Sequence, residues 1–274
     1  MHTGQHRSNR VTRSVEFVEH KLYQPGDPIS SLDWKVFART DKLMIRKQSA
    51  DTDANVVFLL DASGDMQSTH SGNIDDWTES KFGRALTAVA GLAHMSEKRG
   101  DPIGLWVAGG ADIPTGLKGY IPPSQRSLRS VFHRLASVHP SGEAKMHTHL
   151  DRLAVHLPRK SVVIIVSDWM EDPSLWGPKL ETLTAIGHDV RCLQLYSKVE
   201  WELRLPESIQ VYSAEQQEHI PLDTPAMKSA WLEAVQQYRT EVEEWSGRAR
   251  AIWVQAAVEE ELLPPLIRLV RGRA

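Results

Sequence analysis

The sequence is poor in cysteine and in long apolar runs, and these two absences narrow the class of protein. Its 274 residues include a single cysteine, Cys192, which excludes an intramolecular disulfide and a zinc cage built on cysteines. The longest aliphatic runs, at 56–60 and 162–166, are far shorter than the roughly 20 residues of a membrane-spanning helix. We therefore expect a soluble chain with no membrane span.

A strong charge of one sign and an apolar amino-terminal segment are also lacking. The formal net charge is -3 at pH 7, which argues against a protein that binds nucleic acid in bulk. The first residues contain no apolar core of a signal peptide, so none is expected. Together with the single cysteine, these features favour a reducing compartment, and we expect a cytoplasmic protein.

What the sequence does contain is an alternation of apolar strands and amphipathic helices. Two continuous apolar runs, 55–60 and 161–167, are typical of central strands in a parallel sheet that is covered on both faces. Weaker strands are predicted at 103–107, 190–196, 210–212 and 251–254. Helices are predicted at 78–98, 127–137, 150–157, 173–186 and 225–246. This order predicts an α/β fold with a doubly wound, mostly parallel sheet.

The last predicted helix carries an apolar stripe from Met227 to Trp245, which we interpret as core packing. Residues 1–50 do not follow the alternation and are interpreted as an extended amino-terminal leader. A turn is predicted at 25–27 and a strand at about 43–48. Because a short leader cannot bury Trp34 on itself, we expect it to pack on the α/β domain at 51–274.

The residues after the two central strands carry oxygen donors at spacings that suit a cation. Asp61, Ser63 and Asp65 are two residues apart, and Asp168 follows the second strand. Sites in open α/β sheets form outside the carboxyl ends of the strands. Carboxylate and hydroxyl oxygens are the ligands that Mg²⁺, Mn²⁺ and Ca²⁺ prefer. Thr148, expected to precede a helix, is the predicted donor from a third loop.

Two other interpretations of these residues remain open. Asp61 and Asp168 can instead cap the turns and helices that follow the strands, as aspartate often does. His147 and His149 flank Thr148 and would suit a transition metal, although histidines in exposed loops are the commoner case.

Short motifs extend from residue 23 to residue 190. They are Tyr23-Gln24-Pro25-Gly26-Asp27, Leu32-Asp33-Trp34-Lys35, Ala38-Arg39-Thr40, Leu59-Leu60-Asp61-Ala62-Ser63, Lys81, Gly100-Asp101-Pro102-Ile103-Gly104-Leu105, Ser167-Asp168 and Gly187-His188-Asp189-Val190. With these motifs the sequence resembles, over about residues 4–270, the domain of unknown function 58 family, a bacterial family whose carboxyl-terminal half is similar to a von Willebrand factor A domain.

The resemblance implies a metal-ion-dependent adhesion site of the form Asp-x-Ser-x-Ser with a distant threonine and a distant aspartate. On this sequence the corresponding residues are Asp61, Ser63, Thr148 and Asp168, and Asp65 stands where the family has serine. Such a site leaves one coordination position of a divalent cation open to an acidic side chain of a partner. The additional carboxylate of Asp65 would hold the cation more tightly and repel that partner.

The resemblance also implies a function, because genes of this family commonly lie beside those of AAA+ ATPases of the MoxR class. We therefore expect a non-enzymatic adaptor or co-chaperone that links such an ATPase to a protein client through the variant metal site. One alternative is a scaffold whose metal site has decayed. Another is a magnesium-dependent phosphatase with Asp61 as nucleophile, although the usual acid two residues later is replaced by Ser63.

Overall fold

The computed structural model describes residues 18–23, 34–48, 54–69, 77–110, 119–203, 208–213 and 218–272. The chain divides into two compact units, Met1–Thr52 and Asp53–Ala274. The turn predicted at 25–27 lies outside the described residues. Packing of the leader on the α/β domain stays a prediction.

The described residues of the first unit form two strands and one helix. Strands β1 (Val18–Leu22) and β2 (Met44–Gln48) pair antiparallel, and α1 (Trp34–Thr40) lies between them in sequence. The strand predicted at 43–48 corresponds to β2, whereas the extended conformation predicted for the rest of the leader is wrong at α1. These helical residues include neither glycine nor proline, so no local feature prevents a helix.

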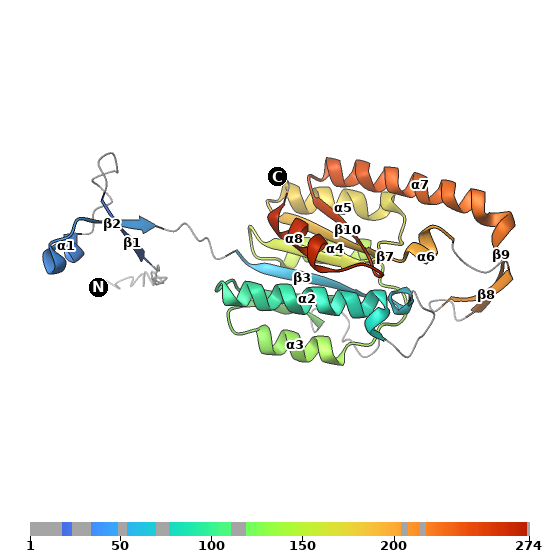
Figure 1. Ribbon diagram of the computed structural model, residues 1–274, viewed down its shortest axis with the longest axis horizontal. Coiled ribbons are helices and arrows are strands. Elements are labelled where there is room, and N and C mark those ends of the chain that lie inside the picture. Colours follow the sequence, from blue (N-terminus) through green and yellow to red (C-terminus); the bar gives the residue numbers. More distant parts are fainter. Residues whose placement is uncertain are drawn as a thin grey trace, which may run out of the picture. The chain divides into compact units, whose positions relative to one another are not determined.

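The second unit is built on a six-stranded sheet with the order β10-β7-β6-β3-β4-β5 (Figure 1). All neighbouring strands are parallel except β4 and β5. The predicted doubly wound, mostly parallel α/β fold is thereby confirmed. The strands are β3 (Val56–Ala62), β4 (Ile103–Gly109), β5 (Ile121–Ser124), β6 (Val162–Ser167), β7 (Asp189–Tyr196) and β10 (Ile252–Ala257).

Helices cover both faces of this sheet (Figure 1). Every residue of β3 is buried, which explains why its first five residues, 56–60, are continuously apolar rather than alternating. One face carries α2 (Lys81–Lys98), α3 (Leu128–Ser137) and α8 (Leu263–Arg271). The other carries α4 (Met146–His156), α5 (Pro173–Ala185) and α7 (Thr224–Arg248). Short helices are η2 (Gly64–Gln67), η3 (Trp77–Glu79) and α6 (Lys198–Trp201).

Near α7 one sequence prediction is confirmed and another is corrected. The strand predicted at 210–212 is β8 (Ser208–Ser213), which pairs with β9 (Glu218–Asp223) in a separate two-stranded sheet. The stripe predicted to be core is only partly buried, because Val242 is buried whereas Met227 is 42% exposed. A helix as long as α7 extends about 38 Å and a six-residue strand about 20 Å, so the sheet cannot cover all of it.

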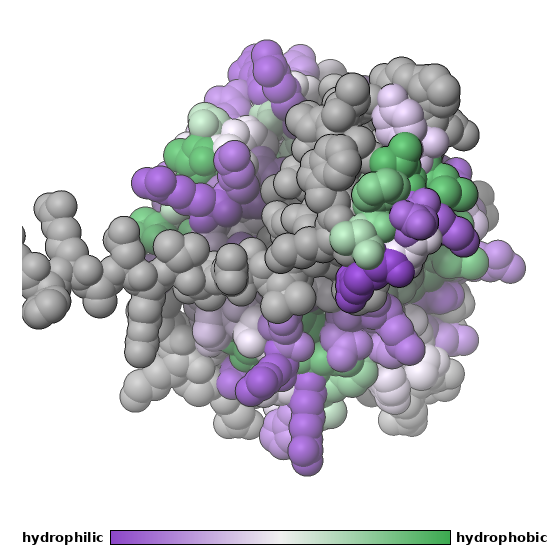
Figure 2. Space-filling model, turned by 90° about the vertical axis from the view of Figure 1, so that its left-hand side faces the viewer, coloured by the Kyte–Doolittle hydropathy of each residue, from purple (hydrophilic) through white to green (hydrophobic). Residues whose placement is uncertain are grey.

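No helix in the described part of the chain combines the length and the apolarity that a membrane-spanning segment requires. On the face drawn in Figure 2, groups of hydrophobic residues are bordered by hydrophilic ones.

Candidate functional site

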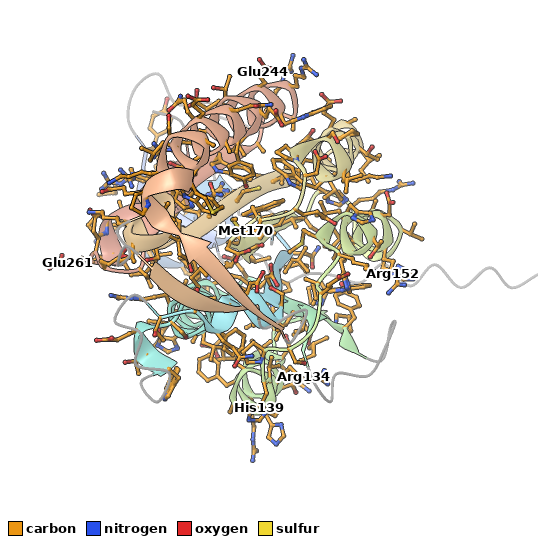
Figure 3. The ribbon with its side chains drawn as sticks, turned by 90° about the vertical axis from the view of Figure 1, so that its right-hand side faces the viewer. Arg134, His139, Arg152, Met170, Glu244 and Glu261 are labelled. Carbon is orange, nitrogen blue, oxygen red and sulfur yellow. The ribbon has the colours of Figure 1, made fainter. Side chains whose placement is uncertain are left out.

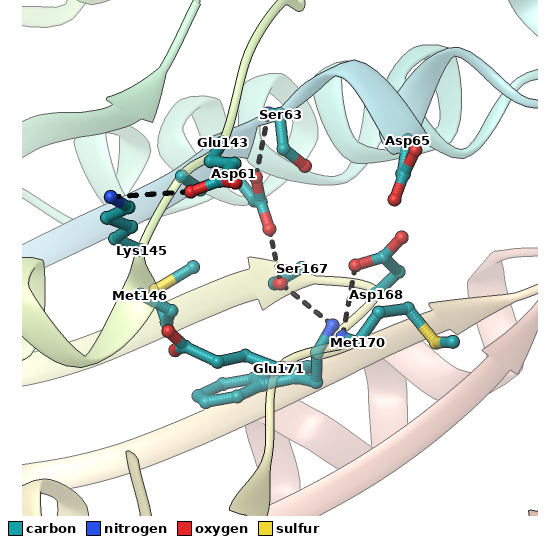
Figure 4. A pocket seen from close by; sticks show the side chains of 12 residues that line it. Asp61, Ser63, Asp65, Glu143, Lys145, Met146, Ser167, Asp168, Met170 and Glu171 are labelled. Carbon is teal, nitrogen blue, oxygen red and sulfur yellow. Dashed lines mark hydrogen bonds and ion pairs between the residues drawn. The ribbon is translucent and has the colours of Figure 1, made fainter. Parts of the chain in front are cut away.

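A pocket lies at the carboxyl ends of β3 and β6, where the direction of winding reverses. From β3 the chain continues to β4 on one side, whereas β6 lies on the other side. This is the position at which open α/β sheets form ligand sites. The pocket has a volume of about 220 Å³ (Figure 4). It is lined by Asp61, Ser63, Asp65, Glu143, Ala144, Lys145, Met146, Ser167, Asp168, Trp169, Met170 and Glu171.

Four of the five predicted metal ligands line this pocket, and Thr148 is not among its described lining residues. The prediction that Thr148 precedes a helix is wrong, because α4 begins at Met146 and Thr148 lies in its first turn. The Thr148 hydroxyl donates a hydrogen bond of 2.8 Å to the carbonyl oxygen of Lys145. Threonine often satisfies a backbone carbonyl three residues earlier in this way.

Asp61 is buried, and both of its carboxylate oxygens accept hydrogen bonds. The Ser63 N–H donates to Oδ1 at 2.8 Å, and the Ser167 hydroxyl donates to Oδ2 at 2.5 Å. The register explains the second bond. Leu60 of β3 pairs with Val166 of β6, so the next residues of these parallel strands, Asp61 and Ser167, are also neighbours.

Two carboxyl groups of the pocket have raised pKa values. Burial, and then the nearby charge of Asp168, raise the pKa of Asp61 to about 6. Asp65 is half-buried, and the same two causes raise its pKa. Figure 4 shows the side chains of Asp65 and Asp168 facing each other. The pocket therefore brings together negative charges that repel one another.

Asp168 is paired with a buried lysine. The Nζ atom of Lys81 lies 2.8 Å from Oδ2 of Asp168 and 3.4 Å from Oε2 of Glu200. Lys81 is the first residue of α2, which begins where the Ser80 hydroxyl oxygen accepts a hydrogen bond from the Gly83 N–H. Burial lowers the pKa of Lys81, but Asp168 and Glu200 outweigh this effect and hold the pKa above its usual value. The ammonium group therefore stays charged.

The chain turns sharply directly after Asp168. Trp169 has a φ of 59°, a left-handed conformation that is rare for a bulky residue. Its N–H donates to the Ser167 hydroxyl oxygen at 2.9 Å, and its ring contacts those of Trp176 and Trp253. These contacts hold Trp169 in the strained conformation, and the adjacent Asp168 is thereby held at the pocket.

The two histidines beside Thr148 have separate partners. The His147 ring contacts a carboxylate oxygen of Glu171, and the His147 N–H donates to the other oxygen at 3.0 Å. The Trp106 indole N–H donates to Nδ1 of His149 at 2.9 Å. Burial is the main cause that lowers the pKa of His149 to about 4, so its ring is neutral at pH 7.

These contacts determine whether a divalent cation fits the arrangement. Both oxygens of Asp61 are engaged by Ser63 and Ser167, and Lys81 is paired with one oxygen of Asp168. Among the described residues, no three His, Cys, Asp or Glu side chains are grouped closely enough to hold a metal ion. The residues do not fit a divalent cation in this arrangement. Binding of Mg²⁺, Mn²⁺ or Ca²⁺ stays a prediction for titration to decide.

Sequence reasoning missed several residues of the site, including Ser167, Glu171 and Glu200. Ser167 was missed because the register places Asp61 beside Ser167 rather than beside Asp168, and the two terminal aspartates of the sequence do not reveal this offset of one residue. Glu200 lies in α6, which follows β7, the neighbour of β6, so it belongs to a third segment at the same edge. Lys81 was noted only as part of a motif, since a lysine at the start of a helix is ordinarily exposed.

Comparisons with known proteins found a family profile and several relatives to which the chain is similar. The family profile described as "Protein of unknown function DUF58" matches residues 19–241. Two relatives are the uncharacterized proteins Mb1516 of Mycobacterium bovis and Rv1480 of Mycobacterium tuberculosis. Each is 22% identical over 259 residues, which cover 93% of this chain and 78% of the relative.

The chain is also similar to solved structures, among them BatB and the SpRpn10 VWA domain. BatB from Bacteroides thetaiotaomicron is 13% identical, with a TM-score of 0.49, and the match covers 80% of this chain and 100% of BatB. The SpRpn10 VWA domain is 11% identical, with a TM-score of 0.44, and the match covers 78% of this chain and 94% of that domain.

Proposed function

The chain belongs to the DUF58 family. We propose that it is a non-enzymatic protein-interaction module, which receives a partner's side chain in the pocket between β3 and β6. The observation that carries the proposal is the size of the pocket. Its volume of about 220 Å³ is below the roughly 300–1,000 Å³ of small-molecule sites. It therefore admits a side chain rather than a whole substrate.

The charge of the pocket favours a cationic side chain of the partner. Five lining residues are acidic, whereas only Lys145 is basic. Glu143 pairs with Lys145 at 3.4 Å, and Asp168 pairs with Lys81. Asp65 makes no hydrogen bond or ion pair through its carboxylate with another described residue, and we assign it to contact the partner. The acidic partner expected from the sequence would need a bound cation to offset these charges.

An exposed apolar side chain adjoins this charge. Met170 lines the pocket and is 55% exposed, and Figure 3 shows it near the middle of the view. Leu175, in the first turns of α5, is 45% exposed. Apolar contact around a buried charged group is a common arrangement at protein interfaces.

We propose that the partner is a MoxR-class AAA+ ATPase and that the chain acts in the cytoplasm as its adaptor or co-chaperone. The support for this partner is the family resemblance, because genes of such ATPases commonly lie beside genes of this family. The support for a non-enzymatic role is Asp61, whose two oxygens both accept hydrogen bonds. A carboxylate engaged in this way is a poor nucleophile, and no acid stands two residues later.

Binding of the purified ATPase of the same host to immobilised wild-type chain tests the proposal. Asp65→Lys reverses the charge assigned to the partner contact and should weaken binding about tenfold or more. Glu244→Lys is the matched control, because Glu244 is an exposed residue of α7 far from Met170 (Figure 3), and it should leave binding unchanged. Equal binding by wild type and Asp65→Lys would favour the scaffold with a decayed site. No binding by the wild type would exclude this ATPase as partner.

A further inference from the structure

The position of Lys81 is unusual for a lysine. It is 3% exposed and opens α2, where the positive end of the helix dipole disfavours a cation. Removal of an ammonium group from water is also costly unless carboxylates surround it. A lysine that only improved the solubility of the helix would extend into water. The placement of Lys81 therefore depends on its carboxylate partners.

Those partners come from the segments, loop or short helix, that follow the carboxyl ends of three different strands. Asp168 follows β6 and lies 2.8 Å from the ammonium group, and Glu200 follows β7 and lies 3.4 Å from it. Asp65 follows β3 and adds its negative charge to theirs. Carboxylates of separate loops gathered around one positive charge are typical of a bound divalent cation. In this chain the positive charge is covalently attached to α2.

Lys81 and the cation predicted from the sequence would require the same carboxylates. Two of the predicted ligands, Asp65 and Asp168, are among the three acids that interact with Lys81. A third predicted ligand, Asp61, has both oxygens engaged. We propose that Lys81 is the resident cation of this pocket: its ammonium group takes the place of a divalent metal ion, and the pocket is complete without metal.

The proposal does not depend on the partner, because its test uses metal ions alone. The full chain is titrated with Mg²⁺, Mn²⁺ and Ca²⁺ in a calorimeter. Lys81→Met removes the charge and keeps the length of the side chain, whereas Lys81→Arg keeps the charge. The wild type and Lys81→Arg should bind none of the ions at millimolar concentration. Lys81→Met should bind at least one of them, with a dissociation constant about tenfold or more below the highest concentration at which the wild type shows no binding.

A double variant tests whether Asp168, once it is no longer paired with Lys81, becomes a ligand of the metal ion. Lys81→Met/Asp168→Asn removes both charges of the ion pair and should lose the metal binding that Lys81→Met gains. If Lys81→Met is unfolded without metal, Mn²⁺ or Mg²⁺ should restore its thermal transition, since metal binding to the folded state stabilises that state.

Three results would overturn the proposal. One is wild-type binding as tight as that of Lys81→Met, because the lysine would then not compete with metal. Another is a folded Lys81→Met that binds none of the three ions. The third is an unfolded Lys81→Met that no ion restores. A failed ATPase-binding experiment would leave each of these results unchanged, so the two proposals fail separately.

Discussion

Gly177 of α5 approaches Trp245 of α7 so closely that a Cβ atom at residue 177 would lie 2.2 Å from Cδ2 of the indole ring. The two helices belong to the layer that covers one face of the sheet. The missing side chain at residue 177 is therefore what lets the Trp245 ring pack on α5.

Gly177→Ala should lower the free energy of unfolding by about 1–3 kcal/mol, because the methyl group overpacks the contact with Trp245. This loss should outweigh the gain of up to about 1 kcal/mol in helix propensity. Gly91→Ala in α2 is the control, since a Cβ there meets no atom within 4 Å, and it should raise stability. Urea unfolding measures both, and a change of the same sign in both variants would contradict the packing argument.

Asp61→Asn should stabilise the protein in a pH-dependent manner. The pKa of Asp61 is raised from 3.8 to about 6 in the folded state, so the folded protein holds this proton more tightly than the unfolded chain. Its ionisation therefore costs stability as the pH rises from about 4 to about 6, and the cost is about 3 kcal/mol above that range. Relative to the wild type, Asp61→Asn should be more stable at pH 8 and nearly equal at pH 4.

Chemical unfolding of both proteins at the two pH values tests this difference. Glu244→Gln is the control, because Glu244 is exposed. The effect of this substitution on the free energy of unfolding should be small at both pH 4 and pH 8. An Asp61→Asn protein that is less stable than the wild type at pH 8 would show that the two hydrogen bonds of Asp61 matter more than its desolvation.

Asp168→Asn should be strongly destabilising, because it leaves the buried ammonium group of Lys81 without its nearest carboxylate. Loss of one member of a buried ion pair costs about 3–5 kcal/mol. Glu200→Gln removes the more distant partner, whose side chain is 37% exposed, and should cost less than about 1 kcal/mol. Thermal and urea unfolding rank the two variants, and a larger loss for Glu200→Gln would reverse the assigned roles.

The chain should hydrolyse no generic phosphate monoester or carboxylate ester in the presence of Mg²⁺ or Mn²⁺. The reason is the engaged carboxylate of Asp61 and the serine at residue 63, where an acid would be required. A colorimetric screen with chromogenic substrates measures the activity. Turnover that is present in the wild type and lost in Asp61→Asn would support the phosphatase alternative instead.

The sequence predicts the sheet well because each central strand is marked by a continuous apolar run and a terminal aspartate. The run at 56–60 is covered on both faces, and its β3 residues are all buried. The helix α1 and the strand β9 were not predicted, because each has only a few residues and a weak period. The predicted stripe of α7 was read from periodicity alone, which gives no information on how much of a long helix the sheet covers.

The candidate site was predicted from loop positions, and this reasoning located Asp61, Ser63, Asp65 and Asp168 at one pocket. It could not locate Lys81, because an ion pair across 87 positions leaves no local pattern. It also misplaced Thr148, since one turn of helix decides whether its hydroxyl faces a loop or its own backbone. Spacing therefore identifies which strand ends meet, whereas pairing of the side chains depends on the packed structure.

The distance along the chain between Lys81 and Asp168 also has a consequence for folding kinetics. Their contact closes a loop of 87 positions, whose closure entropy costs about 4 kcal/mol, whereas β3, α2 and β4 are consecutive in sequence. Because contacts among β3, α2 and β4 close shorter loops, we expect the Lys81–Asp168 pair to form after them, once β6 has joined β3. An interaction formed after the rate-limiting step slows unfolding and leaves the folding rate nearly unchanged. The buried ion pair of Lys81 is therefore expected to slow the unfolding step in which β6 separates from β3.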